Sequence, residues 1–185
     1  MAETNERTDP FTTLGLPARY DLEPRAIERA YLERAARLHP DLVGGDEDAA
    51  ARAAAELNRA KRTLEHHERR AIALLEKLGG PSAAQDRSLP DGFLIEMLER
   101  REQIESALAS SDRAQVQRWE AWAADERARY RRRVGEMFDS LGETPEPEAL
   151  RAIRVQLNAW RYIERLIEQL DPDYDPARAD FGDEG

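Results

Sequence analysis

Apolar residues recur every three or four positions along most of this chain, and no stretch alternates apolar and polar residues as a half-buried strand would. That spacing places the apolar side chains on one face of an α-helix. Ala, Arg, Glu and Leu dominate the sequence and β-branched residues are sparse, a composition that also favours helices. The sequence therefore predicts an all-α fold.

Turn-forming residues divide the chain into helical segments. A short first helix is expected to end near Gly15. A second helix is expected over about 24–38, because Pro24 suits the first turn of a helix. A long third helix is expected over 47–78, with 66–70 as the place where it could break. Three more helices are expected after it, over 91–109, 112–141 and 145–170.

A stretch rich in Gly and Pro over residues 79–90 is the clearest linker in the sequence. It separates an N-terminal module over 11–78, in which two helices form a hairpin, from a C-terminal three-helix bundle over 91–170. Residues 1–10 are expected to be a disordered lead-in, and the acidic residues 171–185 a fraying tail. The sequence leaves open whether the two modules are rigidly docked or hinged at the linker.

The composition excludes several classes of function. The chain has 185 residues, a net charge of −10 and no cysteine. The negative charge argues against a general phosphate-binding surface. The lack of cysteine removes disulfides, thiolate metal sites and cysteine nucleophiles. No apolar run approaches the length of a membrane span, and the polar N-terminus has no signal-peptide pattern. We therefore expect a soluble cytoplasmic protein with no membrane or nucleic-acid partner.

The tripeptide His39-Pro40-Asp41 follows the second predicted helix and is the main candidate functional motif. Between two antiparallel helices it would present an imidazole and a carboxylate on a rigid, exposed turn, which suits docking to a partner. No cysteine or obvious serine nucleophile stands beside His39, and Asp41 does not complete a metal-ligand spacing. The motif therefore indicates binding rather than catalysis.

The remaining polar residues single out no catalytic site. His66 and His67 are adjacent, so on a helix they point about 100° apart and do not converge on one ion. No cysteine or carboxylate completes a recognised ligand spacing with them. The 38 acidic residues mark no particular carboxylate pair. We expect no catalytic residue, no metal site and no cofactor, and we interpret the chain as a non-enzymatic protein.

The first helix of the C-terminal module divides into a core side and an exposed side on a helical wheel. At about 100° per residue, Ile95 lies roughly 160° from Met97, and Leu98 lies roughly 100° from it. Both should therefore leave the core and stand exposed beside Glu99 and Glu102. The core side is expected to consist of Phe93, Met97, Ile104 and Leu108.

The last helix adds an aromatic residue to this surface. Tyr162 falls roughly opposite the predicted buried stripe of that helix, which consists of Ile153, Leu157, Trp160 and Ile167. Exposed aliphatic and aromatic side chains ringed by charge are typical of a partner-binding surface.

Four segments of the chain resemble the HscB family of J-domain co-chaperones, which serve iron–sulfur cluster assembly. "FTTLGLPARYDL" matches the family's "FxxLGLPxRYxL" and is much more specific than the tripeptide that follows it. "LNRAKRTLEHHERRAIALLEKLGG" is similar to the family's third-helix segment. "FLIEMLERREQIE" resembles the opening of its C-terminal domain, and "RYIERL" resembles its last helix. The resemblance covers about residues 11–170 in a consistent order.

The resemblance implies a co-chaperone with two partners. It would accelerate ATP hydrolysis by a DnaK-type (HscA-like) chaperone and deliver to it an iron–sulfur cluster scaffold protein (IscU-like). The implied chaperone contacts are His39, Pro40 and Asp41, with Arg29 and Arg37 as basic contacts. The implied scaffold contacts are Leu94, Ile95, Leu98, Glu99, Arg101, Glu102 and Tyr162.

Two residues depart from the family pattern. Leu42 follows the tripeptide where lysine is common, and Arg34 takes a place that is usually apolar. Arg34 must extend its charged end past Ile27 and Leu38 to reach water, or the packing there must differ. Two other hypotheses stay open. The chain could be a J-domain protein for another client, with a C-terminal bundle that merely oligomerises, or a helical interaction scaffold in which the tripeptide is coincidental.

Overall fold

The computed structural model describes residues 9–38, 47–110 and 112–170. Every regular element in these ranges is an α-helix, so the predicted all-α fold class is confirmed. None of the helices in these ranges is long and apolar enough to cross a membrane. In chain order they are α1 (Pro10–Leu14), α2 (Pro24–Arg37), α3 (Glu47–Glu65), α4 (His67–Lys77), α5 (Phe93–Ser110), α6 (Arg113–Asp139) and α7 (Pro147–Leu170).

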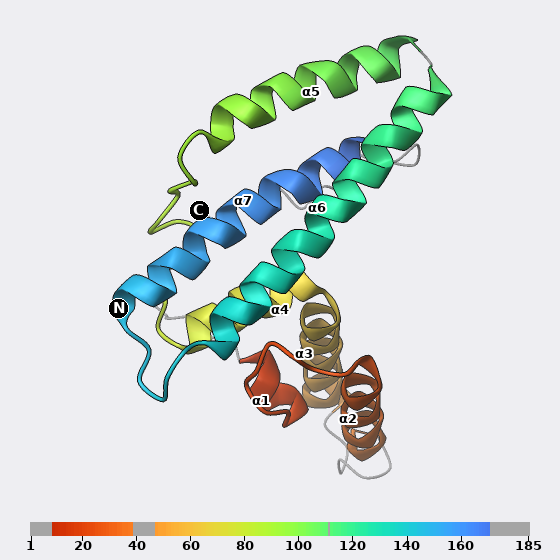
Figure 1. The fold of residues 1–185 in the computed structure, drawn as a ribbon. Helices are drawn as coiled ribbons and strands as arrows, with labels where there is room; N and C mark the ends of the chain where they lie inside the picture. The colour runs from red at the N-terminus through yellow and green to blue at the C-terminus, as the bar shows by residue number, and fades with distance from the viewer. Residues whose placement is uncertain (1–8, 39–46, 111, 171–185) are drawn as a thin grey trace.

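Figure 1 shows how these helices are arranged. α6 and α7 form a long pair, α5 runs along one side of it, and α4 lies against both α6 and α7. α2 and α3 stand side by side as a hairpin at the other side of α4, with α1 packed against them. The expected hairpin and three-helix bundle are therefore both present, while α4 packs with the C-terminal helices although it precedes the linker.

Local sequence explains the bounds of α1. The Asp9 carboxylate caps the helix by accepting hydrogen bonds from two backbone N–H groups of its first turn. It also lies 2.6 Å from Lys77 Nζ at the end of α4. Gly15 ends the helix in the left-handed conformation, with φ of 56°. Asp9 and Pro10 thus belong to α1 and its cap rather than to a lead-in over 1–10, and the other domain bounds stay a prediction.

The long helix expected over 47–78 is broken at His66, inside the segment where a break was expected. His66 has φ of −88° and ψ of 120°, which turns the chain from α3 into α4. The buried side chain of Arg70 closes this corner. Its Nη1 donates hydrogen bonds to the carbonyl oxygens of Leu22 and Leu64, at 3.3 and 3.0 Å. The corner places the following helix against the C-terminal bundle.

The two modules share one hydrophobic core, so they are docked rather than hinged, a point that the sequence left open. Buried side chains from α1 to α4 pack with buried side chains from α6 and α7 in one continuous cluster. The C-terminal helices contribute Val134, Phe138, Leu150, Ile153, Leu157 and Trp160 to it.

Tyr20, between α1 and α2, lies at the centre of this junction. Its ring stacks on Phe138 of α6 with centroids 5.7 Å apart, and the guanidinium carbon of Arg70 lies 5.5 Å from the ring centroid. A Cβ at Gly135 would lie 3.2 Å from the ring, so a side chain there would press on it. Burial raises the pKa of Tyr20 to about 12. Its hydroxyl finds no hydrogen-bond partner in the described part of the chain.

A second cluster holds α5 on α6 and α7. Near the turn that leads into α6, the buried side of α5 moves to Ala107, which is 1% exposed, whereas Leu108 is 39% exposed. The prediction that Leu108 belongs to the core is therefore wrong. The predicted core residues Phe93, Met97 and Ile104 are confirmed as buried.

α7 is packed on more than one side, because α4, α5 and α6 all contact it. Ile153, Leu157 and Trp160 are buried as predicted, and Ile167 is half-buried. Tyr162 is half-buried as well, with its ring edge-on to that of Phe93 at a centroid distance of 5.7 Å. Tyr162 is therefore less exposed than its predicted position opposite the buried stripe implied, because the helical wheel assumed a single packed side.

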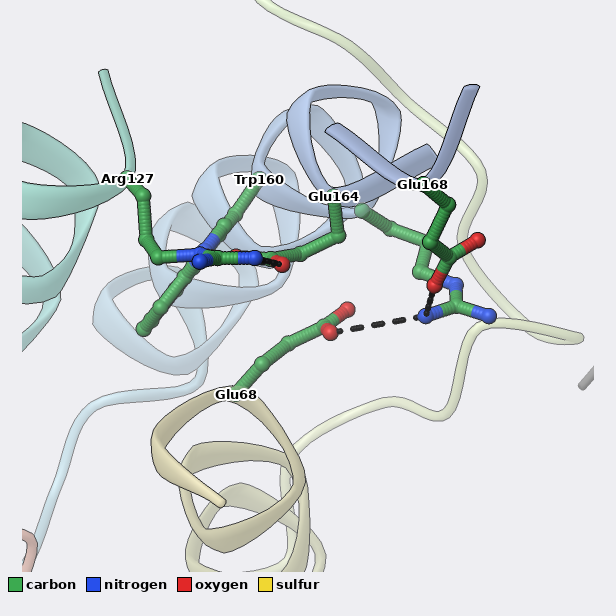
Figure 2. A network of polar contacts seen from close by, with 6 residues as sticks. Glu68, Arg127, Trp160, Glu164 and Glu168 are labelled. Atoms are coloured by element: carbon green, nitrogen blue, oxygen red, sulfur yellow. Dashed lines mark hydrogen bonds and ion pairs between the residues drawn. The ribbon is translucent and has the colours of Figure 1, made fainter. Parts of the chain in front are cut away.

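A buried polar network joins α4, α6 and α7 (Figure 2). Glu164 accepts hydrogen bonds from Arg127 Nε and from Trp160 Nε1, each at 2.8 Å. Burial alone would raise the pKa of Glu164, but the hydrogen bonds and the charge of Arg127 bring it below its usual value. Glu164 is therefore held as a paired carboxylate.

Glu68 of α4 points into the same network and is less well paired (Figure 2). It is 2% exposed, its Oε2 lies 3.6 Å from Arg161 Nη1, and its Oε1 accepts no hydrogen bond from any described residue. Burial raises the pKa of Glu68 to about 7, Arg161 opposes that rise, and the nearby carboxylates of Glu164 and Glu168 add to it. Glu68 therefore titrates near neutral pH.

Substitutions at Tyr20 should separate the role of its ring from that of its hydroxyl. Tyr20→Ala removes the ring between α4 and α6 and should lower the free energy of unfolding by about 3–5 kcal/mol. Tyr20→Phe removes only a buried, unpaired hydroxyl and should leave that free energy unchanged or raise it. Urea unfolding followed by circular dichroism measures both variants. Equal losses in the two variants would contradict the packing role.

Glu68 should make the stability of the fold depend on pH. Because its pKa rises from the usual 4.5 to about 7, the folded state binds the proton more tightly than the unfolded state. The free energy of unfolding should therefore fall as pH rises through this window, by on the order of 3 kcal/mol. Glu68→Gln should gain stability relative to the parent chain between pH 5 and pH 8, whereas the exposed control Glu33→Gln should not. If the free energy of unfolding of Glu68→Gln changes with pH in parallel with that of the parent chain, Glu68 is not the cause of the pH dependence.

Candidate partner-binding surfaces

The tripeptide His39-Pro40-Asp41 and Leu42 lie outside the described residues, in the connection from α2 to α3. The described helices fix where that connection starts and ends. α3 has 19 residues, so it is about 28 Å long at 1.5 Å per residue, and its last residue leads into α4. The ends of α2 and α3 that flank the tripeptide therefore lie at the far end of the hairpin from α4.

Polar contacts hold α2 and α3 in register. The Tyr31 hydroxyl donates a hydrogen bond to Asn58 Oδ1 at 2.8 Å. Lys61 Nζ pairs with Glu28 at 2.8 Å and lies 4.9 Å from the Tyr31 ring centroid. These exposed pairs contribute little stability individually. Together they fix how the two helices that carry the tripeptide lie against each other.

The predicted basic contacts Arg29 and Arg37 are both exposed on α2. Leu32 is 55% exposed and stands three residues from Arg29, so the two side chains are neighbours on the helix surface. Leu32 was not predicted from the sequence as part of this surface. Its position outside the apolar stripe of α2 was the signal that could have identified it.

Arg34 is accommodated by a glycine in α1's cap. The side chain of Arg34 is half-buried, and a Cβ at Gly15 would lie only 1.7 Å from Arg34 Nη2. The guanidinium therefore lies directly over Gly15, beyond the apolar stripe of α2. The absence of a side chain at Gly15 thus explains how an arginine fits where an apolar residue is usual.

α5 carries most of the large apolar side chains that are exposed in the described ranges. Of the five large apolar side chains that are exposed in the described ranges, four lie on α5 and the fifth is Leu32. Leu94 is 48% exposed, Ile95 67% and Leu98 56%. The predicted exposure of Ile95 and Leu98 is confirmed, while their role in binding stays a prediction.

The charges of α5 are partly neutralised within the helix. Of its four glutamates, one pairs with Arg100 at 2.5 Å and another with the predicted contact Arg101 at 2.7 Å. Glu99 and Glu102, both exposed and both predicted contacts, form no ion pair with any described residue. These two carboxylates are therefore free to meet a partner's charge.

Tyr162 is brought to the start of α5 by its contact with Phe93, the residue before Leu94. The predicted scaffold contacts thus lie on α5 between Leu94 and Glu102 and on the adjacent part of α7. Because Tyr162 is half-buried, part of its ring supports α5 and only the remainder is accessible.

The two central histidines take structural positions. His66 lies at the N-terminal cap of α4, and His67 Nδ1 contacts Arg70 Nη2. Burial, together with the charges of Arg70 and Arg131, lowers the pKa of His67 to about 4. Within the described residues, no group of three or more His, Cys, Asp or Glu side chains is placed to hold a metal ion.

Comparisons with known proteins match this arrangement. A family model described as the HSCB C-terminal oligomerisation domain matches residues 89–171. The co-chaperone protein HscB homolog of Bordetella petrii is 29% identical over 167 residues, which is 88% of this chain and 94% of that protein.

Two solved structures share the fold. The chaperone HscB from Vibrio cholerae superposes with a TM-score of 0.71 at 23% identity, over 88% of this chain and 95% of its own. The human co-chaperone protein HscB superposes with a TM-score of 0.74 at 18% identity, over 92% of this chain and 82% of its own. Both likenesses extend across the N-terminal and the C-terminal helices.

Proposed function

The chain is a member of the HscB family of co-chaperones, as its sequence predicted, and on this premise we propose that it works in iron–sulfur cluster assembly. It stimulates ATP hydrolysis by a DnaK-type (HscA-like) chaperone and delivers to that chaperone the scaffold protein (IscU-like) on which clusters are built. It performs no covalent chemistry itself.

The observation that carries the scaffold half of this proposal is the concentration of exposed apolar side chains on α5. Leu94, Ile95 and Leu98 lie within the segment that matches the family's C-terminal domain, and each is about half exposed or more. Surface apolar residues are common singly, but a cluster bordered by charge is typical of a binding site. Glu99 and Glu102 supply that border.

The chaperone half depends on the hairpin. His39-Pro40-Asp41 follows α2, whose exposed residues Arg29 and Arg37 favour an acidic partner surface. We add Leu32 to this surface, because it is exposed next to Arg29 and has no packing role within the described residues. The register contacts between α2 and α3 hold the surface in shape.

The mechanism is differential binding. The hairpin favours the hydrolysis-competent state of the chaperone, because it binds that state more tightly than the others. The α5 surface holds the scaffold on the same molecule, which raises the scaffold's effective concentration at the chaperone. The core shared by the two modules fixes the distance between the two surfaces. Both partners can therefore be bound without a change in the conformation of the linker.

A second candidate is self-association through α5. The matching family domain is described as an oligomerisation domain, and an exposed apolar helix face can pair with a second copy of itself. Sedimentation of the purified chain, alone and with the scaffold protein, distinguishes the two. If the chain forms a dimer by itself, and the scaffold neither dissociates that dimer nor binds to it, self-association is favoured.

His39→Gln should abolish stimulation of the chaperone. The substitution keeps a polar side chain of similar size but removes the imidazole, so the steady-state ATP hydrolysis rate should return to near the chaperone's basal rate. Scaffold affinity, measured by calorimetry, should stay unchanged in the same variant. Stimulation at the parental level would contradict the chaperone half of the proposal.

Leu94→Ala combined with Leu98→Ala should weaken scaffold binding by about fivefold to 150-fold, about 1–3 kcal/mol, because both side chains lose apolar contact area. Calorimetric titration with the scaffold protein measures this. Leu32→Ala is the matched control, since it removes an equally exposed leucine from α2 and should leave scaffold affinity unchanged. Parental affinity in a folded double variant contradicts the scaffold half.

A further inference from the structure

A groove between α5 and α6 has no role in the function described so far. It has a volume of about 330 Å³, and its lining residues come from the C-terminal half of α5 and the first two turns of α6. That volume is at the small end of the range for ligand pockets and is enough for one long side chain. The groove is lined by Glu102, Gln103 and Ser106 of α5 and by Gln115 and Trp119 of α6.

One wall of the groove is aromatic. Trp119 is half-buried, and its ring lies edge-on to that of Trp122 with centroids 5.5 Å apart and an interplanar angle of 82°. This packing holds the indole in one orientation while part of it lines the groove. The face of an indole ring carries negative electrostatic potential and attracts cations.

The opposite wall supplies a free negative charge. Glu102 is exposed and forms no ion pair with any described residue. The other lining side chains are neutral amide and hydroxyl groups, and no basic residue of the described part of the chain lines the groove. The groove thus combines a carboxylate with an aromatic face and contains no cation of its own.

The same two helices already bind a cation in this way, about one turn of α6 away. The guanidinium carbon of Arg100 lies 4.6 Å from the ring centroid of Trp122, and its Nη2 pairs with Glu96 at 2.5 Å. A tryptophan from α6 and a glutamate from α5 therefore hold an arginine between them. Trp119 and Glu102 repeat that pair of groups, but the arginine is missing.

We propose that this groove binds an arginine or lysine side chain of the partner protein, with the charged end on Glu102 and the stem against Trp119. The identity of that partner as the iron–sulfur scaffold protein rests on the function proposed above. Since Glu102 also belongs to the predicted scaffold surface, the groove extends that surface around α5 onto α6. A basic side chain inserted there fixes the register of the docked scaffold and discriminates against proteins that lack it.

The groove can be tested without the scaffold. The chain has three tryptophans, so a ¹⁵N spectrum gives three indole N–H signals. Titration with millimolar arginine amide should shift the Trp119 signal, whereas glycinamide, which has no long cationic side chain, should not. Trp160 is the internal control, because it is 1% exposed and donates to Glu164. An unmoved Trp119 signal, or an equal shift in the Glu102→Gln variant, overturns the proposal.

The second arm measures affinity for the scaffold protein. Glu102→Gln and Trp119→Leu, which keeps an apolar side chain in the packing, should each weaken binding about tenfold. The control is Glu120→Gln, which removes an exposed carboxylate of α6 outside the groove. The indole signals of Trp122 and Trp160 report whether the Trp119→Leu variant is folded.

The combined outcomes separate the two proposals. If Leu94→Ala with Leu98→Ala weakens binding while Glu102→Gln and Trp119→Leu bind normally, the groove proposal is overturned and the proposed function stands. If none of these variants changes scaffold binding, the scaffold half of the proposed function fails as well. Weakening in all of them, with Glu120→Gln unaffected, supports both.

Discussion

The packing of Tyr20 between α4 and α6 is the interaction on which the rest of the molecule depends. Its ring lies on Phe138 and Arg70, and Gly135 leaves room for it. Tyr20 precedes α2, so the same contact that fixes its ring also fixes where the hairpin begins. Around it the N-terminal and C-terminal helices merge into one core. The two candidate surfaces therefore belong to one body, although a Gly- and Pro-rich linker separates their sequences.

The two surfaces differ in their chemistry in a way that suits two different partners. On α2, the exposed residues Arg29, Leu32 and Arg37 lie in this order toward the tripeptide. On α5, exposed leucines and isoleucine are bordered by Glu99 and Glu102, which have no intramolecular partner among the described residues. Opposite charge at the two surfaces directs each partner to its own site, chiefly through the rate of encounter. The buried network around Glu68 and Glu164 holds α4 in place between the two surfaces.

Much of the fold could be predicted from the sequence. Helix bounds followed from local signals: Gly15 and Pro24 punctuate the chain as expected, and the break fell inside 66–70. The helical wheel correctly predicted that Ile95 and Leu98 are exposed, because α5 is packed on one side only. The role of the tripeptide came from resemblance to a family, since a histidine and an aspartate on a turn indicate docking but name no partner.

The errors have a common physical origin. A helical wheel assumes one buried stripe, yet α7 is packed by α4, α5 and α6, so Tyr162 is half-buried where exposure was expected. Leu108 was wrongly predicted to be buried, because the buried side of α5 shifts near the turn into α6. The groove lined by Trp119 and Glu102 could not be predicted from the sequence for a related reason. It depends on how two helices lie against each other, which no pattern along one helix contains.

Both surfaces lie on one rigid body, because the N-terminal and C-terminal helices share one core. Because the chain has no native cysteine, spin labels can be attached at cysteines replacing the exposed residues Arg52 on α3 and Arg118 on α6. Pulsed electron paramagnetic resonance then gives the distribution of distances between the two modules. A rigid body should give a single narrow distribution that stays unchanged when both partners are added. A broad distribution, or two populations that the partners shift, would contradict it.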